Sequence, residues 1–248
     1  MDLAFNRLVA ILQRRYQSFF SPARAVPFAL RTSTGLSYTF GDGEPAFAIV
    51  AVRENGVAAL RTLDLSRIAE AYVRGDLEID GDLRRALMLR TAFADRHPIA
   101  FLWRFIQPLL FGQVRSDAKW ISRHYDFPAE FYLCFLDDRH RCYSQGIFAR
   151  DDEPLADAMT RKLDFALEAI GATAGSRVLD IGGGLGGDDG ARRAENLDRN
   201  RELIESNWRA ELFRKFRLYL WACADSFERD LAQAYRWILR KPELAHGA

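Results

Sequence analysis

The sequence predicts an α/β protein, and three observations support this prediction. Between residues 27 and 61, short apolar runs alternate with glycine-containing turns, which is typical of a small β-sheet. In residues 155–170, apolar side chains recur at the spacing of an amphipathic helix. A strand-like run at residues 176–181 leads into a glycine-rich loop. A chain that combines such strands and helices belongs to the mixed α/β class.

The composition describes a chain that can bury a sizeable core and that has almost no net charge. Of its 248 residues, 49% are apolar, and 35 basic residues oppose 34 acidic ones for a net charge of +1. This balance gives no reason to expect a nucleic-acid partner. Cysteines 134, 142 and 223 match no zinc or disulfide spacing, so we expect no metal and a reducing compartment. Neither a membrane span nor a secretory signal is recognisable, which indicates a cytoplasmic protein.

Residues 1–21 are predicted to form an amphipathic helix. Apolar residues recur near a 3.6-residue period, and Arg7, Arg14 and Arg15 occupy polar positions. Such a helix packs on its own domain or lies on anionic lipid, which would make the protein peripheral at the membrane. Packing on the chain itself is the more common case, and both alternatives stay open.

Residues 22–95 are predicted to form an independent α+β unit. Apolar runs at 28–31, 36–40, 46–52 and 57–60 are separated by Thr34-Gly35, Gly41-Asp42-Gly43 and Asn55-Gly56. These turn signals favour hairpins and therefore a small antiparallel sheet. A helix is expected over residues 65–73 with Asp64 as its cap, followed by an acidic, glycine-punctuated stretch that enters another helix.

Residues 96–120 are predicted to be an apolar connector. The run 99–111 is interrupted by Arg104 and Pro108 and is too short to cross a bilayer. Burial is the more common state of such a segment. A surface that meets phospholipid or the partner subunit of a homodimer would look the same, so these partners stay open.

Residues 121–248 are predicted to form an incomplete Rossmann-like domain. Gly182, Gly184 and Gly186 follow the predicted strand, and a helix start after them would supply backbone N–H groups to a nucleotide-like cofactor. A flexible glycine turn explains the same pattern. A doubly wound sheet needs several βαβ units of about 30 residues each. The residues after the loop are mainly helix-forming, with 231–239 as the one candidate strand, so the sheet lacks its middle.

Five segments form an ordered set along the chain. They are residues 68–83; His124-Tyr125-Asp126-Phe127-Pro128 with Phe131-Tyr132 and Leu136-Asp137; Tyr143-Ser144; Val178-Leu179-Asp180-Ile181-Gly182-Gly183-Gly184-Leu185-Gly186-Gly187; and residues 216–227. In this order they resemble the cyclopropane-fatty-acyl-phospholipid synthase family and its relatives, the mycolic-acid methyltransferases. The resemblance covers about residues 25–187 and 192–240.

The resemblance implies a methyltransferase that uses S-adenosylmethionine, with a lipid-carrier-like N-terminal domain. In this family the double bond of a phospholipid acyl chain attacks the methyl group of the cofactor, and bicarbonate then removes a proton so that the ring closes. Tyr143 and Ser144 match the pair that contacts the cofactor, and Gly182, Gly184 and Gly186 match the glycines of its loop. These five residues are the cofactor-binding residues that the resemblance implies.

The sequence departs from the family where the base would be held. Gln145 stands in place of a cysteine that helps to hold bicarbonate, and Arg201 stands in place of a bicarbonate-binding tyrosine. The family's glutamate, histidine and adenine-side residues lie between the glycine loop and the C-terminal motif, where this chain has only residues 188–191. We therefore assign no catalytic residue, and we expect weak or no cofactor binding, as after an internal deletion.

Three interpretations follow. The chain is an impaired or inactive methyltransferase of this family, a non-enzymatic remnant that binds lipid or a partner, or a product whose middle was lost.

The remaining polar residues have structural explanations. His124 is expected to be a hydrogen-bonded structural residue, and His97 and His140 are expected on the surface. The acidic clusters 137–138 and 151–153 are expected to be caps and solvated faces rather than an ion site.

Overall fold

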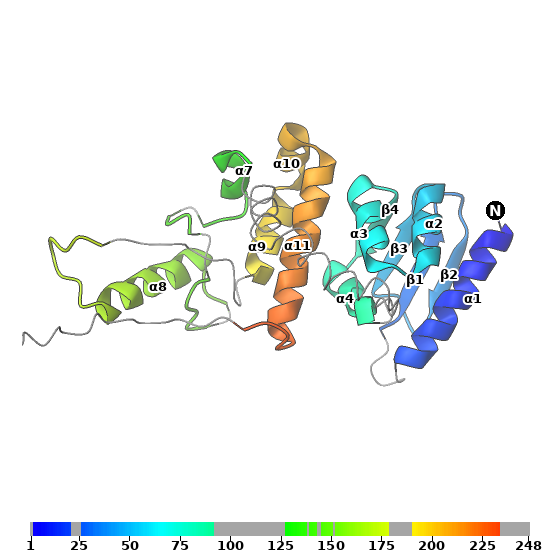
Figure 1. The fold of residues 1–248 in the computed structure, drawn as a ribbon, viewed down its shortest axis with the longest axis horizontal. Helices are drawn as coiled ribbons and strands as arrows, with labels where there is room; N and C mark the ends of the chain where they lie inside the picture. The colour runs from blue at the N-terminus through cyan, green and yellow to red at the C-terminus, as the bar shows by residue number, and fades with distance from the viewer. Residues whose placement is uncertain are drawn as a thin grey trace, which may run out of the picture.

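A computed structural model describes residues 2–20, 26–91, 127–137, 139–142, 145–150, 152–178 and 190–233. The N-terminal part is built on a β-sheet, and the second part is a group of helices (Figure 1). The predicted connector 96–120 and the predicted glycine loop at 182–187 both lie outside the described residues. None of the helices in the described part of the chain has the length and apolarity to cross a membrane.

The sheet has four strands in the order β2-β1-β3-β4. They are β1 (Phe28–Thr32), β2 (Ser37–Phe40), β3 (Phe47–Ala51) and β4 (Leu77–Gly81). The predicted antiparallel pairing is correct for β1 with β2 and wrong for β1 with β3, which are parallel. The reason is the path of residues 41–46: β2 ends beside Phe28, and the chain then crosses the end of β1 and starts β3 on its other side. No turn signal encodes that crossing.

Two further predictions in this part are corrected. Asn55-Gly56 is not a hairpin turn but lies in helix α2 (Glu54–Thr62), which also contains the predicted strand at 57–60. The acidic stretch before the next helix forms β4, which pairs antiparallel with β3. Gly56 explains the first correction, because a Cβ there would lie 2.3 Å from the Asp76 carbonyl oxygen just before β4. The glycine permits close packing rather than a turn.

The next helices follow the predicted local signals. Helix α3 (Leu65–Arg74) begins where Asp64 accepts hydrogen bonds from the backbone N–H groups of Ser66 and Arg67, which confirms the predicted cap. Asp82 caps the short α4 (Leu83–Leu87) in the same way, and the 3-10 helix η1 (Met88–Thr91) follows. Helices α2 and α3 lie over one face of the sheet (Figure 1).

Helix α1 (Asp2–Phe19) shares the core of the sheet. Its apolar stripe, Phe5, Leu8, Leu12 and Tyr16, is at most 7% exposed and belongs to the same buried cluster as Phe28, Leu30 and Phe40. Of the two alternatives for this stripe, the structure shows packing on the chain itself. The opposite, arginine-bearing side of α1 therefore faces solvent.

The second part consists of α7 (Ala129–Leu133), α8 (Leu155–Ala169), α9 (Gly190–Arg199), α10 (Arg201–Trp208) and α11 (Ala210–Glu228). The helix predicted at 155–170 is confirmed as α8. No strand occurs in the described residues from 127 onward, and residues 231–233 of the candidate C-terminal strand are not extended into a sheet. Residues 176–178, the start of the strand predicted at 176–181, are exposed and form no strand. The rest of that strand and the glycine loop lie outside the described residues, so the incomplete Rossmann-like domain stays a prediction.

Helix α11 stands between the two parts and contacts both (Figure 1). Toward the sheet, the Arg214 guanidinium lies 2.9 Å from the Glu78 carboxylate of β4. The Arg217 guanidinium donates to the Asp198 carboxylate of α9 at 2.7 Å and to the Tyr72 hydroxyl of α3 at 3.2 Å. Burial raises the pKa of Tyr72, so this hydroxyl stays protonated in neutral solution. One helix thus connects α3, β4 and α9.

We expect Gly56→Ala to lower the free energy of unfolding by about 1–3 kcal/mol, because the new Cβ collides with the Asp76 carbonyl oxygen. In an ordinary helix interior the same change stabilises. Urea denaturation measures the effect. The neighbouring exposed Asn55→Ala is the control and should be neutral or slightly stabilising. A Gly56→Ala variant more stable than wild type would contradict the packing of α2 on residue 76.

Candidate functional site

The candidate site is the 137–153 segment, which carries the predicted cofactor pair. Tyr143 and Ser144 lie outside the described residues, as do the loop residues Gly182, Gly184 and Gly186, so the structure does not show whether these five come together. The residues on both sides of Tyr143 and Ser144 are described. They show how the segment is fastened.

Asp137 fastens the segment before Tyr143. Its side chain is 5% exposed, and its two carboxylate oxygens accept hydrogen bonds from the backbone N–H groups of His140 at 2.6 Å and Cys142 at 3.2 Å. Arg141 between them has a φ of 54°, so the chain turns tightly here. The carboxylate thus holds a turn and caps no described helix, and its side chain is buried, so the helix cap or solvated face predicted for residues 137–138 is wrong for Asp137.

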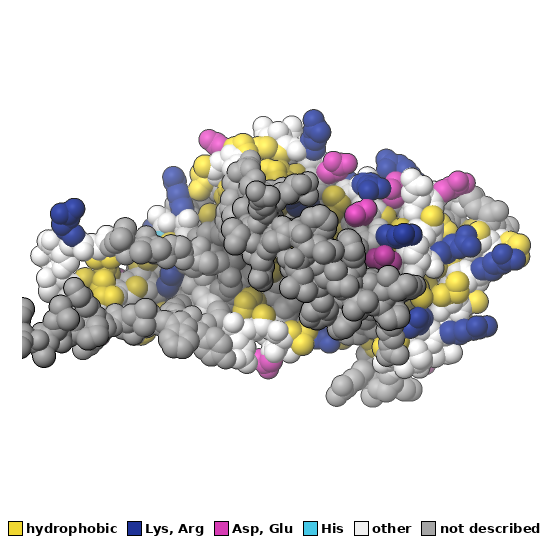
Figure 2. All heavy atoms as spheres, in the orientation of Figure 1, with side chains coloured by type: hydrophobic (Ala, Val, Ile, Leu, Met, Phe, Trp, Pro, Cys, Tyr) yellow, Lys and Arg dark blue, Asp and Glu magenta, His cyan; other side chains and the backbone are white. Residues whose placement is uncertain are grey.

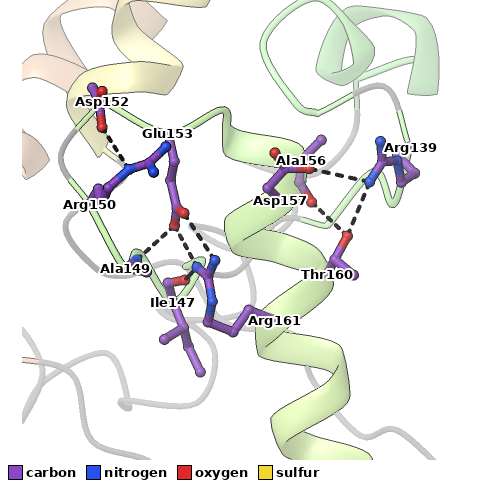
Figure 3. A network of polar contacts seen from close by, with 10 residues as sticks. All are labelled: Arg139, Ile147, Ala149, Arg150, Asp152, Glu153, Ala156, Asp157, Thr160 and Arg161. Atoms are coloured by element: carbon purple, nitrogen blue, oxygen red, sulfur yellow. Dashed lines mark hydrogen bonds and ion pairs between the residues drawn. The ribbon is translucent and has the colours of Figure 1, made fainter.

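Glu153 fastens the segment after Ser144 (Figure 3). Its side chain is 6% exposed and lies against the Arg161 guanidinium of α8, with nitrogen–oxygen distances of 2.5 and 3.0 Å. One carboxylate oxygen also accepts the backbone N–H of Ala149 at 2.8 Å, and Arg161 donates to the carbonyl oxygen of Ile147. The hydrogen bond from Arg161 holds the pKa of Glu153 below its ordinary value.

The solvated face predicted for residues 151–153 is therefore wrong for Glu153. Its partner Arg161 lies eight residues further along the chain, on α8. The residues next to Glu153 and Arg161 in the sequence show no apolar pattern that would predict a buried position. Asp152, in contrast, is 82% exposed and pairs with Arg150. In the sequence, the signal for the Glu153–Arg161 ion pair is the presence of two opposite charges eight residues apart.

Further contacts seat the segment on α8. The Ile147 N–H donates to the Ala158 carbonyl oxygen at 3.0 Å, and a Cβ at Gly146 would lie 2.8 Å from the Ala158 Cβ. His140, predicted on the surface, is half-buried with its Nε2 2.8 Å from the Thr160 Oγ1. His97 and His124 lie outside the described residues. Tyr143 and Ser144 thus belong to a stretch that is anchored to one helix on both sides.

The two motif segments of the second part, residues 127–132 and 216–227, lie against each other. Phe131 of α7 and Phe216 of α11 have ring centroids 4.6 Å apart, and both are buried. Asn200 donates from its Nδ2 to the Cys134 carbonyl oxygen at 2.7 Å, which ties the start of α10 to the end of α7. The motif at 127–132 and the C-terminal motif, which are far apart in sequence, therefore form one aromatic cluster.

The two departures from the family occupy different surroundings. The Gln145 amide oxygen is buried, and no hydrogen-bond partner for it is found among the described residues. Arg201 bonds Glu205 one turn along α10 at 3.0 Å, and its guanidinium lies 5.3 Å from the Phe213 ring centroid. Arg201 is thus engaged in local helix contacts, and it offers no acid–base chemistry at neutral pH.

A polar groove adjoins the 137–153 segment. It has a volume of about 550 Å³ and lies between α7, α8 and α9, with Asp137, Arg139, Arg192 and Arg199 in its walls. Its size is in the range of small-molecule sites. No group of three potential metal ligands occurs in the described parts of the chain.

We expect Glu153→Gln to loosen the segment, because the Arg161 guanidinium loses its charged partner and the Ala149 N–H loses a charged acceptor. Since the pKa of Glu153 is lowered in the folded state, its contribution is complete above the ordinary glutamate pKa and is lost as the pH falls through the folded-state value. The stability difference between wild type and variant should therefore be present at pH 7 and shrink below about pH 4.

Hydrogen exchange of the Ala149 amide and urea denaturation at several pH values measure this effect. The exposed Asp152→Asn is the control, which removes a carboxylate next door without touching Arg161. Equal exchange rates in both variants would show that Glu153 does not hold the segment.

Comparison with known proteins shows which proteins this region is similar to. The sequence profile of the family "Mycolic acid cyclopropane synthetase" matches residues 113–194. A probable fatty acid methyltransferase of Pseudomonas putida is 28% identical over 164 residues, which is 65% of this chain and 40% of the relative.

Two other relatives are more similar over shorter stretches. Methoxy mycolic acid synthase MmaA3 of Mycobacterium tuberculosis is 39% identical over 72 residues, 29% of this chain and 24% of the relative. Sphingolipid C9-methyltransferase of Komagataella phaffii is 31% identical over 124 residues, 47% of this chain and 25% of the relative. The chain thus spans 40% or less of the length of these relatives. Residues 113–194, which include the anchored segment, are thus similar to the mycolic acid cyclopropane synthetase family.

Proposed function

We propose that this chain is an S-adenosylmethionine-dependent methyltransferase by descent, directed at unsaturated acyl chains of phospholipid, with strongly impaired methyl transfer. The observation that carries the proposal is the family match over residues 113–194. That match includes Tyr143, Ser144 and the glycines of the predicted loop. The coverage of the relatives is partial, so the activity is inferred from this region alone.

The relatives' names support the substrate class. They name a fatty acid, a mycolic acid and a sphingolipid, which share a long hydrocarbon chain. A hydrocarbon chain offers no polar group at the reacting carbons, so the reaction depends on a strongly electrophilic methyl donor and on exclusion of water. That the acyl chain belongs to a phospholipid is inferred from the resemblance of the ordered motifs and not from the names of these relatives.

The anchored segment supports a cofactor-binding role for its centre. S-adenosylmethionine, when bound, supplies a methyl group on a sulfonium centre. The hydroxyl groups of Tyr143 and Ser144 and the N–H groups of the glycine loop would hold its methionine end. The Asp137 turn and the Glu153–Arg161 pair restrict the backbone on both sides of Tyr143 and Ser144, which lowers the cost of ordering these residues around a ligand.

The short joint after the glycine loop supports impairment. Helix α9 starts at Gly190, and the described residues 190–233 continue as helices without a strand. A ribose is held by a carboxylate at the tip of the second strand in such folds, and nothing in residues 190–233 occupies that position. Gln145 and Arg201 further replace the residues that the resemblance assigns to the base.

The second candidate, a non-enzymatic lipid-binding remnant, is favoured by one observation. A small pocket of about 120 Å³, open to solvent on one side and with an almost wholly apolar lining, lies between the sheet, α3, α4 and α11, bordered by Ile49, Ile68, Ile79 and Leu218. Covering an apolar lining with hydrocarbon removes it from water, which is favourable. The N-terminal part therefore has a place for a short stretch of alkyl chain that needs no methyl transfer.

We expect no methyl transfer to unsaturated phospholipid. Purified chain is incubated with radiolabelled S-adenosylmethionine and mixed lipid vesicles, with the Pseudomonas putida relative as the positive control and boiled protein as the blank. Incorporation above the blank would overturn the proposed impairment. It would show that other residues supply the catalytic base and hold the adenosine of the cofactor.

We expect S-adenosylhomocysteine to bind with a dissociation constant in the millimolar range or weaker. The loss of several contacts of about 1 kcal/mol each weakens binding roughly a thousandfold. Isothermal titration measures the constant, with Gly184→Val as the variant that blocks the loop. Micromolar binding that disappears in Gly184→Val would show a working pocket.

A further inference from the structure

The outward face of α1 is fixed by the core beneath it. Because Phe5, Leu8 and Leu12 are buried against the sheet, the side chains on the opposite side of the helix point into solvent. Arg7 and Arg14 are exposed on that side, two turns or about 10 Å apart along the helix axis.

Two more arginines extend this face. Arg15 is half-buried on the flank of α1, and Arg61 is exposed in the last turn of α2. Arg61 borders the same groove as Ala4 of α1, so the end of α2 lies beside the start of α1. Figure 2 shows dark blue side chains over α1 and α2 at the right of the molecule. We call Arg7, Arg14, Arg15 and Arg61 the arginine face.

The arginine face has charges that the described chain does not neutralise. No ion pair with a carboxylate of the described residues is found for any of its four members, whereas Arg67 and Arg74 on α3 pair with Asp64 and Glu70. Leu3, on the same outward side of α1, is 66% exposed. Unpaired guanidinium groups beside an exposed apolar side chain are suited to a surface that is anionic outside and apolar beneath.

We propose that the arginine face binds the anionic headgroups of a phospholipid bilayer. Guanidinium groups donate two hydrogen bonds to one phosphate, and a rigid helix seated on a sheet presents them without ordering a flexible segment. Attraction by the bilayer surface adds up over the arginines and weakens with salt. In contrast to a helix inserted in the bilayer, α1 keeps its apolar stripe in the protein core.

This inference gives the proposed lipid function a docking surface, and it relies on that function only for the choice of phospholipid. Binding to vesicles needs neither S-adenosylmethionine nor turnover, so it is measured separately from methyl transfer. Failure of the methyl-transfer proposal leaves the binding experiment unchanged, and the reverse also holds.

Co-sedimentation with vesicles of phosphatidylglycerol and phosphatidylcholine tests the proposal, with pure phosphatidylcholine vesicles alongside. We expect binding only to the anionic vesicles and a decrease from 50 to 300 mM salt. The triple variant Arg7→Gln, Arg14→Gln, Arg61→Gln should bind on the order of a hundredfold more weakly.

The matched control removes three arginines that have carboxylate partners, Arg31→Gln, Arg67→Gln and Arg74→Gln, and should keep most of the binding. Circular dichroism melts show that both variants remain folded. Equal losses in both variants would overturn the proposal, because bulk charge would then explain the binding. Equal binding to neutral vesicles, or tighter binding to a DNA duplex at the same salt, would overturn it as well.

Discussion

The Arg217 guanidinium is the contact on which the arrangement of the molecule depends. Its side chain is 15% exposed and lies between the Asp198 carboxylate and the Tyr72 hydroxyl. A charge this far from water is costly unless its partners stay in place, so the pairing fixes α3, α9 and α11 relative to one another. Trp221 adds a hydrogen bond from its indole N–H to the same Asp198 carboxylate. On either side of Arg217, Phe216 enters the aromatic cluster and Leu218 packs on the core under the sheet.

Support for the candidate site passes outward from α11 in steps. Phe216 contacts Phe131 of α7, and α7 precedes the Asp137 turn directly. From that turn the chain is fastened to α8 through Thr160, Ala158 and Arg161. Tyr143 and Ser144 thus lie in a stretch whose described flanks are held by hydrogen bonds to the Asp137 carboxylate, by contacts with α8 and by the Glu153–Arg161 ion pair.

Local chemistry was predictable from the sequence, and pairings between distant residues were not. The Asp64 cap and helix α8 follow from side chains that act on their own backbone or repeat on one face, and both are confirmed. The parallel β1–β3 pair depends on where residues 41–46 carry the chain, and Gly56 is helical because of Asp76, twenty residues away. The burial of Glu153 depends likewise on Arg161. For Tyr143, Ser144 and the loop glycines, motif order rather than geometry carries the assignment.

The position of Leu218 on the core of the N-terminal part has a consequence for biosynthesis. The residues of β4, α3 and α4 leave the ribosome long before α11 does, and the apolar surface that Leu218 and its neighbours cover is bare during that interval. At roughly 5–20 residues per second, the wait is on the order of ten seconds. During this time the nascent chain exposes an apolar surface that chaperones and other nascent chains can bind. Completion of α11 ends that exposure, so the packing of the N-terminal part is finished only when a helix made much later is in place.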